Sequence, residues 1–122
     1  MIRVAAAVCI QNGKVLLASR PVDKPPAGWE FPGGKLEAGE TVQQAAIREL
    51  KEELNWNILP LDIIYQLKKG NIILSFVRVI PADDTLPVPC ENQQLKWVEL
   101  SEEFPENMLE NDREFWQFLT GR

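Results

Sequence analysis

The stretch that decides the fold is GWEFPGGKLEAGETVQQAAIRELKEELNW, residues 28–56. From Thr41 onward, apolar residues recur every four positions, at Val42, Ala46, Leu50 and Leu54. This spacing predicts an amphipathic helix with one apolar stripe. Thr41 followed by Gln44 is typical of a capping box at the helix start. Asn55 suits the left-handed residue that ends such a helix, so both ends of the helix are predicted.

Three glutamates of this predicted helix share one face. Glu49, Glu52 and Glu53 are spaced i, i+3 and i+4, and Glu40 lies where the helix begins. Like charges at this spacing repel each other and cost helix stability. One interpretation is a solvated acidic surface, since most acidic side chains are exposed. The other is a site for a divalent cation, because Mg²⁺ prefers carboxylate oxygens.

The rest of the chain is expected to form short strands and one more helix, separated by turns and loops. Alternating apolar stretches predict strands at residues 2–10, 14–18, 58–65, 71–80 and 95–100. Asn12-Gly13 between the first two is a hairpin signal. Proline-rich loops are expected at 21–26 and 81–89, and a final helix at about 107–119. The order predicts a single α/β (α+β) domain over residues 1–122, with strands packed against helices.

Composition excludes several classes of chemistry. The 122 residues contain no histidine, which excludes Ser-His-Asp and Cys-His nucleophile systems and histidine-ligated zinc. The net charge of −5 argues against a stable nucleic-acid complex. Cys9 and Cys90 have no metal-binding spacing, and Cys9 is expected to be buried. With no signal peptide and no membrane-spanning stretch, we expect a cytoplasmic protein without a membrane partner.

The acidic segment carries a more specific pattern. Gly34 is followed after five residues by Glu40, and after seven more by Arg48-Glu49-Leu50-Lys51-Glu52-Glu53. This resembles the Nudix hydrolase signature G-x5-E-x7-R-E-U-x-E-E-x-G-U, where U is a bulky aliphatic residue. If each fixed letter matches by chance about one time in fifteen, all six match about once in ten million starts. Asn55 and Trp56 depart from the signature, but neither departure removes a charged group.

The likeness extends to the MutT-like branch of the Nudix family. Residues 29–35, WEFPGGK, resemble that branch's approach to the signature, and Cys90-Glu91 followed by Trp97 resembles its distal segment. The resemblance implies a Nudix fold with a mixed β-sheet between helices. It also implies hydrolysis of a nucleoside triphosphate to the monophosphate and pyrophosphate, with an oxidised purine such as 8-oxo-dGTP as the first candidate. The alternatives are a cytosine nucleotide, CTP or 5-methyl-dCTP, and a nucleotide-binding module without catalysis.

The resemblance further implies a magnesium-dependent reaction, with Mn²⁺ as an alternative metal. A protein of net charge −5 repels a triphosphate unless cations neutralise the site. The implied metal ligands are Glu49, Glu52, Glu53, Glu91 and the backbone carbonyl of Gly33. Glu49 is the first candidate for the base that takes a proton from the attacking water, and Glu53 is the second. Glu40 is expected to support the metal ligands.

Three more residues of this region have two interpretations each. Arg48 either forms an i, i+4 salt bridge with Glu52 or orients the metal-binding glutamates without contacting the substrate. Both roles are structural. Gly34 is likewise expected to have a structural role. Lys35 is an exposed loop lysine, or lies near the phosphates and stabilises the leaving group. Glu91 alone is a surface acid, but its spacing to Trp97 favours a metal ligand.

By the same resemblance, Arg20, Phe31 and Asp112 are assigned to substrate binding, and the protein to a monomer or small homo-oligomer. Arg20 is otherwise an edge arginine. Asp112 lies where MutT-like proteins hold the purine edge, and an ionised carboxylate accepts hydrogen bonds, which suits the donors of guanine. The alternative for Asn111-Asp112 is an N-cap, with Glu114 three residues after Asn111. Phe76 and Trp29 are candidates for base stacking or for the core.

Overall fold

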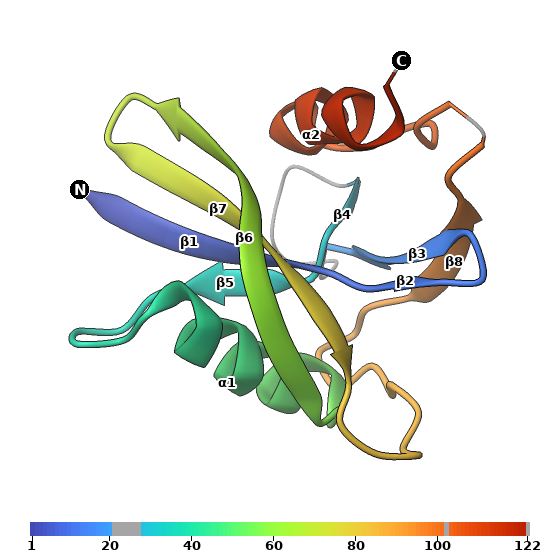
Figure 1. Ribbon diagram of the computed structural model, residues 1–122, viewed down its shortest axis with the longest axis horizontal. Coiled ribbons are helices and arrows are strands. Elements are labelled where there is room, and N and C mark those ends of the chain that lie inside the picture. The colour runs from blue at the N-terminus through green and yellow to red at the C-terminus, as the bar shows by residue number, and fades with distance from the viewer. Residues whose placement is uncertain (21–27, 102, 122) are drawn as a thin grey trace.

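The computed structural model describes residues 1–20, 28–101 and 103–121, which form strands between two helices (Figure 1). The loop expected at 21–26 lies outside the described residues. The elements are β1 (Ile2–Val8), β2 (Ile10–Gln11), β3 (Lys14–Ser19), β4 (Trp29–Glu30), β5 (Gly33–Lys35), α1 (Val42–Leu54), β6 (Ile58–Lys69), β7 (Ile72–Pro81), β8 (Leu95–Glu99) and α2 (Glu110–Thr120).

The strands form two sheets of mixed character. One has the order β5-β1-β7-β6, in which β1 and β7 are parallel and the other pairs antiparallel. In the other, β3 pairs with β8 and also with the short strands β2 and β4. The predicted α/β class with mixed strand pairing is therefore confirmed. The strands are divided between two sheets, however, where the resemblance implied one.

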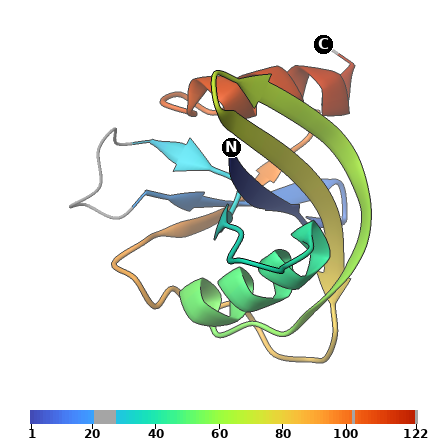
Figure 2. The ribbon, with the colours of Figure 1, turned by 90° about the vertical axis from the view of Figure 1, so that its left-hand side faces the viewer.

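The two helices cover opposite sides of the strands (Figures 1 and 2). The core is divided accordingly, because successive side chains of a strand point to opposite faces. In β1, Ala5 and Ala7 belong to the cluster that contains the apolar stripe of α1, whereas Ala6 and Val8 belong to the cluster around α2. Neither α1 nor α2 is long and apolar enough to cross a membrane, and no other helix occurs in the described residues.

Both ends of α1 lie where the sequence predicts them. The Thr41 hydroxyl accepts a hydrogen bond from the Gln44 backbone N–H at 3.1 Å, and the Gln44 side chain accepts one from the Thr41 N–H at 2.9 Å. This is the predicted capping box. At the other end Asn55 has φ 47° and ψ 40°, in the left-handed region. Trp56 follows, buried, and its indole N–H donates to the Thr85 carbonyl oxygen.

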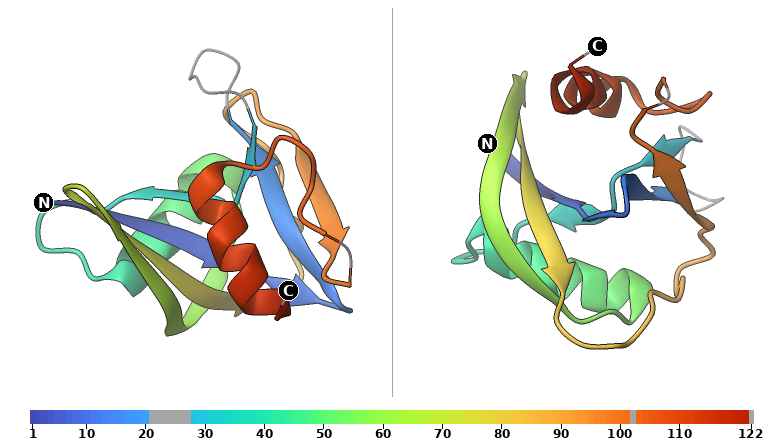
Figure 3. Two further views of the ribbon diagram at one scale, coloured as in Figure 1. Left: turned by 90° about the horizontal axis from the view of Figure 1, so that it is seen from above. Right: turned by 45° about the vertical axis from the view of Figure 1, so that its right-hand side comes forward.

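Several strands differ from their predicted ranges. The stretch expected at 2–10 is interrupted at Cys9, which is buried as expected, so that β1 and β2 belong to different sheets. Asn12 and Gly13 both have positive φ, which confirms the hairpin between β2 and β3. Strand β6 continues four residues beyond its predicted end and pairs with β7 in one long curved hairpin (Figure 3).

Helix α2 begins later than predicted. Its N-cap residue is Leu109, which makes no side-chain capping hydrogen bond, so the N-cap interpretation of Asn111 is wrong. The start is fixed by tertiary pairing: the Leu109 N–H donates to the Trp29 carbonyl oxygen at 3.0 Å, and Trp29 forms a β-bridge with Met108. Asn111 therefore lies inside the first turn.

Residues 31–32 carry the chain from one sheet to the other. Strand β4 pairs with β3, and β5, only two residues later, pairs with β1. The step brings Gly33 against β1 with φ 154°, where a Cβ atom would lie 1.9 Å from the Ala5 carbonyl oxygen. Only glycine fits this approach. The glycine pair thus fixes the distance between β1 and the segment that leads into α1.

The left-handed conformation of Asn55 yields a stability prediction. We expect Asn55→Ala to lower the free energy of unfolding by about 1 kcal/mol, because a Cβ in this region is strained and alanine has no amide to compensate. Asn55→Gly should match or exceed the stability of the parent protein. Urea denaturation of the three proteins measures the difference. Equal stability of the alanine and glycine variants would contradict the capping role.

Candidate active site

A cavity of about 900 Å³ opens between the two helices. Its polar lining comes in two groups. The first derives from β5, from α1 and from the segment before β8, and comprises Lys35, Glu49, Glu52, Glu53, Glu91 and Gln93. The second comprises Arg20, Glu30, Glu110, Asn111 and Asp112. Apolar side chains of β1 and β7, including Val4 and Leu74, line the wall as well.

Glu53 is the most deeply buried acid of the first group, with 6% of its surface exposed. One carboxylate oxygen accepts a hydrogen bond from the Gly33 backbone N–H at 3.1 Å, and the other from the Gln93 side-chain amide at 3.2 Å. The pKa of Glu53 is raised to about 8, chiefly by burial and also by the nearby Glu49 and Glu91, whereas the Gln93 hydrogen bond opposes the rise.

Glu49 lies directly against the second glycine of the pair. A Cβ on Gly34 would lie 2.5 Å from the carboxyl carbon of Glu49, so the absence of a side chain there makes room for this acid. Burial also raises the pKa of Glu49, although its hydrogen bond to Arg48 opposes the rise. Glu52 and Glu91 line the same cavity from exposed positions. Within residues 1–20, 28–101 and 103–121, no three acids or cysteines are gathered closely enough to hold a metal ion.

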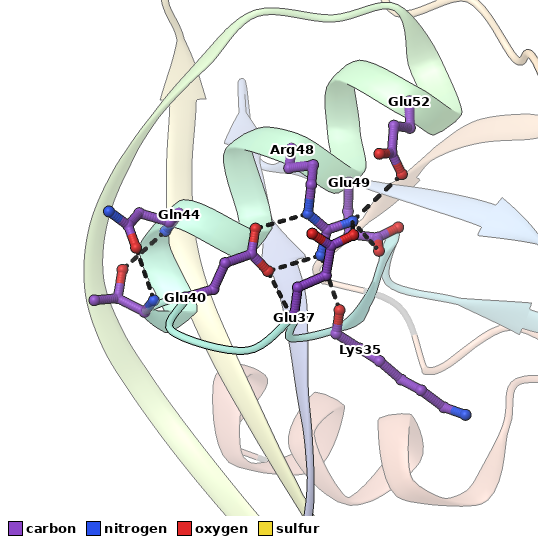
Figure 4. Close-up of polar contacts among 8 residues, drawn as sticks. Lys35, Glu37, Glu40, Gln44, Arg48, Glu49 and Glu52 are labelled. Carbon is purple, nitrogen blue, oxygen red and sulfur yellow. Dashed lines mark hydrogen bonds and ion pairs between the residues drawn. The ribbon is translucent and has the colours of Figure 1, made fainter.

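Arg48 lies at the centre of an ionic network on the outer side of these acids (Figure 4). Its guanidinium donates two hydrogen bonds to Glu40, at 2.7 and 2.8 Å, and single ones to Glu49 at 2.9 Å and Glu52 at 3.4 Å. A further bond goes to the Lys35 backbone oxygen at 2.9 Å. These contacts fit the predicted supporting roles of Arg48 and Glu40, neither of which lines the cavity.

The Arg48 network reaches Glu40, just before α1, but not Glu53 near the end of the helix. Hydrogen bonds from Arg48 hold the pKa of Glu40 well below its usual range, at about 2. The carboxylates of Glu40 and Glu49 in turn raise the pKa of Arg48. Glu53 lies beyond the reach of the guanidinium hydrogen bonds and keeps its raised pKa. The hydrogen bonds that Glu53 accepts in the described residues come from neutral donors, the Gly33 N–H and the Gln93 amide, and the Lys35 side chain points away from Arg48 (Figure 4).

The second polar group gathers around Asp112. Its side chain is 6% exposed, and Oδ2 accepts a hydrogen bond from the Phe31 backbone N–H at 3.0 Å. The pKa of Asp112 is raised to about 7, chiefly by burial and also by Glu30, whereas the Phe31 hydrogen bond and Arg20 oppose the rise. Arg20 and Glu30 form an ion pair at 3.4 Å. Two predicted substrate-binding residues, Arg20 and Asp112, therefore line one cavity with the predicted metal-binding glutamates.

The aromatic candidates lie mainly in the core. Phe31 lines the cavity, but its side chain is 4% exposed and packs edge-to-face against Phe115 and Phe76. Phe76 is fully buried and stacks on Phe115, which favours the core interpretation for Phe76. The Trp29 ring carries the Lys96 ammonium 4.0 Å from its centre. Phe31 contributes its backbone N–H to the cavity, where it donates a hydrogen bond to Asp112.

Two cavity residues were not anticipated from the sequence. Glu30 pairs with Arg20 and influences Asp112; it lies within the WEFPGGK segment, whose resemblance to the MutT-like branch gave roles to Phe31 and Lys35 but none to Glu30. Gln93 contacts Glu53 and follows Glu91 by two residues. The resemblance that pointed to Glu91 covers Gln93 too, but no local pattern marks a glutamine in a polar loop as buried.

The raised pKa of Glu53 predicts how stability depends on pH. Between the unfolded value near 4.5 and the folded value near 8, the folded protein holds a proton that the unfolded chain has released. Raising the pH through this range should therefore lower the free energy of unfolding, by up to about 1.4 kcal/mol per pH unit for one proton.

Glu53→Gln removes this titration, so its stability should depend less steeply on pH than that of the parent protein. Urea denaturation of both proteins at pH 5, 6.5 and 8, in EDTA, measures the two slopes. Asp112 titrates in the same direction in both proteins, so its contribution cancels in the comparison. Identical slopes would show that Glu53 is not the buried proton-binding group.

Comparison with known proteins agrees with this geometry. The family model described as the NUDIX domain matches residues 1–119. The CTP pyrophosphohydrolase of Escherichia coli is 54% identical over 55 residues, 44% of this chain and 41% of that relative, so the match spans less than half of its length. The 8-oxo-dGTP diphosphatase of Proteus vulgaris is 38% identical over 80 residues, 62% of this chain and 71% of that relative.

Solved structures extend the match to nearly the whole chain. The solution structure of the E. coli ORF135 protein superposes with a TM-score of 0.79 at 31% identity, covering 99% of this chain and 89% of that one. The family match over residues 1–119 and this superposition both include the glycine pair, the acidic helix and the second polar group of the cavity. The chain belongs to the Nudix hydrolase family.

Proposed function

We propose that this protein is a metal-dependent nucleoside triphosphate pyrophosphohydrolase that releases the monophosphate and pyrophosphate. The observation that carries the proposal is the composition of one cavity. Carboxylates of α1 line it together with Asp112 and Arg20, which lie at the start of the other helix and at the end of β3. A nucleotide presents these two chemistries in one molecule: phosphates that need cations, and a base edge with hydrogen-bond donors and acceptors.

The residues fit a divalent cation of the magnesium type. Hard oxygen donors line a cavity in which burial raises the pKa of both Glu49 and Glu53. Mg²⁺ is usually held by one or two carboxylates together with substrate phosphates and water, so a ready-made cage of three acids is not required. Glu52, Glu53, Glu91 and the Gly33 carbonyl would hold it. When bound, the metal would neutralise phosphate charge and activate water.

Two glutamates compete for the role of general base, and hydrogen bonding favours Glu49. Both oxygens of Glu53 accept hydrogen bonds, from Gly33 and from Gln93. In the described residues Glu49 uses one oxygen, which accepts from Arg48. The second oxygen of Glu49 accepts no hydrogen bond in the described residues, so water has freer access to it than to either oxygen of Glu53. Glu53 then serves as a fixed ligand, and Lys35 provides positive charge for the leaving phosphates.

For the substrate, an oxidised purine such as 8-oxo-dGTP is our first candidate. Asp112 supports it because the pKa near 7 leaves the carboxyl partly protonated at neutral pH, so the group both accepts and donates hydrogen bonds. The relative from Proteus vulgaris is named 8-oxo-dGTP diphosphatase. A protein of this activity would remove damaged precursors from the nucleotide pool before they enter DNA.

A cytosine nucleotide, CTP or 5-methyl-dCTP, is the second candidate. It is favoured by the 54% identity to the E. coli CTP pyrophosphohydrolase, higher than the 38% identity to the diphosphatase. The stretch of higher identity is also the shorter one, at 55 residues against 80. The mechanism proposed for the acidic face is the same for both nucleotides, so the candidates differ only in what the second polar group recognises.

The first experiment measures pyrophosphate release with Mg²⁺ from 8-oxo-dGTP, dGTP, CTP and 5-methyl-dCTP. We expect turnover that requires the metal and is fastest with 8-oxo-dGTP. Glu53→Gln should lower kcat by several orders of magnitude and leave the fold intact, because a neutral amide cannot replace a metal-binding carboxylate.

The matched control is Glu99→Gln, a surface acid paired with Lys14 outside the cavity, which should keep the parent activity. Normal turnover by Glu53→Gln would remove Glu53 from the metal site. Turnover of none of the four nucleotides, with Mn²⁺ also tried, would contradict the proposed function.

Asp112→Asn tests the second polar group. The amide oxygen still accepts from the Phe31 N–H, but the titrating carboxyl is lost and a permanent donor is gained. The ratio of kcat/KM for 8-oxo-dGTP over CTP should fall at least about tenfold, the effect of one strong hydrogen bond. Glu114→Gln, on the same helix but facing Tyr65, should leave this ratio unchanged. A constant ratio in Asp112→Asn would remove this residue from base recognition.

A further inference from the structure

Gln93 is a buried polar side chain in an exposed segment. Its neighbours Glu91, Asn92 and Gln94 are all exposed, whereas Gln93 has only 7% of its surface exposed. The left-handed conformation of Asn92, φ 54°, accompanies this inward turn. Gln93 lines the cavity beside Glu53 and is one of few polar side chains buried to this degree in the described residues.

The segment around Gln93 is held by backbone hydrogen bonds at both ends. The Val88 N–H donates to the Leu54 carbonyl oxygen and the Cys90 N–H to that of Glu53, both at 2.8 Å. On the far side, the Gln94 N–H donates to the Ser19 hydroxyl at 2.8 Å, and the Ser19 N–H donates to the Gln94 carbonyl oxygen at 2.9 Å. The amide of Gln93 is thus fixed between the end of α1 and the end of β3.

In the described residues, the amide nitrogen of Gln93 has a hydrogen-bond partner and the amide oxygen has none. Its Nε2 donates to Oε1 of Glu53 at 3.2 Å. The amide nitrogen of Gln93 therefore faces the Glu53 carboxyl group, the orientation that an ionised, metal-binding carboxylate requires, and the amide oxygen faces elsewhere. That oxygen is buried and has no hydrogen-bond partner in the described residues. A buried acceptor without a partner costs stability, so folding alone favours an apolar side chain at this position.

We propose that Gln93 is a positioning residue of the active site, whose amide nitrogen fixes the orientation of the Glu53 carboxylate. Together with the Gly33 N–H it holds the two oxygens of Glu53 from two directions. A carboxylate held at both oxygens keeps one orientation toward the cavity. Hydrogen-bonding partners that orient metal ligands typically affect metal affinity or activity by 10- to 100-fold. The inference rests on the proposed function, in which Glu53 is a metal ligand.

The test compares Gln93→Met with Gln94→Met. Methionine preserves the approximate shape of glutamine but removes both the donor and the unpartnered oxygen. We expect Gln93→Met to lower kcat at least tenfold, with KM changed less than threefold, and to raise the dissociation constant of Mn²⁺ about tenfold, measured by electron paramagnetic resonance of the free ion. Its thermal midpoint should be unchanged or higher. Gln94→Met, the same change at the exposed neighbour, should alter none of these quantities.

Gln93→Glu separates the donor from the shape. Glutamate keeps the length and the acceptor oxygens but donates no hydrogen bond when ionised, so it should lose at least as much activity as methionine does. Activity close to that of the parent protein in Gln93→Glu would overturn the proposal. A rise of KM at constant kcat in Gln93→Met would also overturn it, since that result indicates substrate binding. So would loss of activity together with a lowered thermal midpoint.

The Mn²⁺ measurement separates this inference from the proposed function. If the parent protein hydrolyses no nucleotide but Gln93→Met still weakens Mn²⁺ binding without loss of stability, the proposed function fails and the positioning role stands. If the parent protein hydrolyses nucleotides and Gln93→Met matches it in both kcat and Mn²⁺ affinity, the positioning role fails alone.

Discussion

The acidic face of α1 depends on one guanidinium group. Arg48 donates hydrogen bonds to Glu40, Glu49 and Glu52, which would otherwise repel one another at short distance. The bidentate contact with Glu40 needs the planar fork of arginine, which lysine lacks. A fifth hydrogen bond, to the Lys35 backbone oxygen, joins the helix to β5. One side chain thus sets both the spacing of the carboxylates and their distance from the strand that faces them.

Arg48 neutralises Glu40 but makes no hydrogen bond with Glu53, and this difference matters for the site. The carboxylate of Glu40 is well compensated and its pKa falls, whereas Glu53 is buried with amide donors alone and its pKa rises. Burying such a group costs free energy that the protein does not recover internally. A cation that binds only the folded protein supplies the missing charge and stabilises it by mass action. The chain is therefore built with a deficit of positive charge at one defined place.

The parts of this structure that the sequence predicts are those determined locally. The ends of α1 follow from Thr41, Gln44 and Asn55, because their hydrogen bonds lie within the helix and its caps. The start of α2 was misplaced because it is fixed by pairing with Trp29, far away in the chain. Helical spacing placed the glutamates on one face, but the contact between Gln93 and Glu53 joins residues 40 positions apart and has no local signal. The predicted roles of the site residues remain predictions.

The short passage between the two sheets has a consequence for how substrates are distinguished. The Phe31 N–H bonds to Asp112, and the Gly33 N–H, two residues later, bonds to Glu53. Two residues of chain span at most about 7 Å and contain few soft torsions, so a displacement of one amide moves the other. In the proposed function, a poorly fitting base that shifts Asp112 would therefore also disturb Glu53, the proposed metal ligand. In the proposed reaction, selection among nucleotides is expressed in the rate of turnover more than in affinity, and an abundant undamaged nucleotide can occupy the cavity without being destroyed.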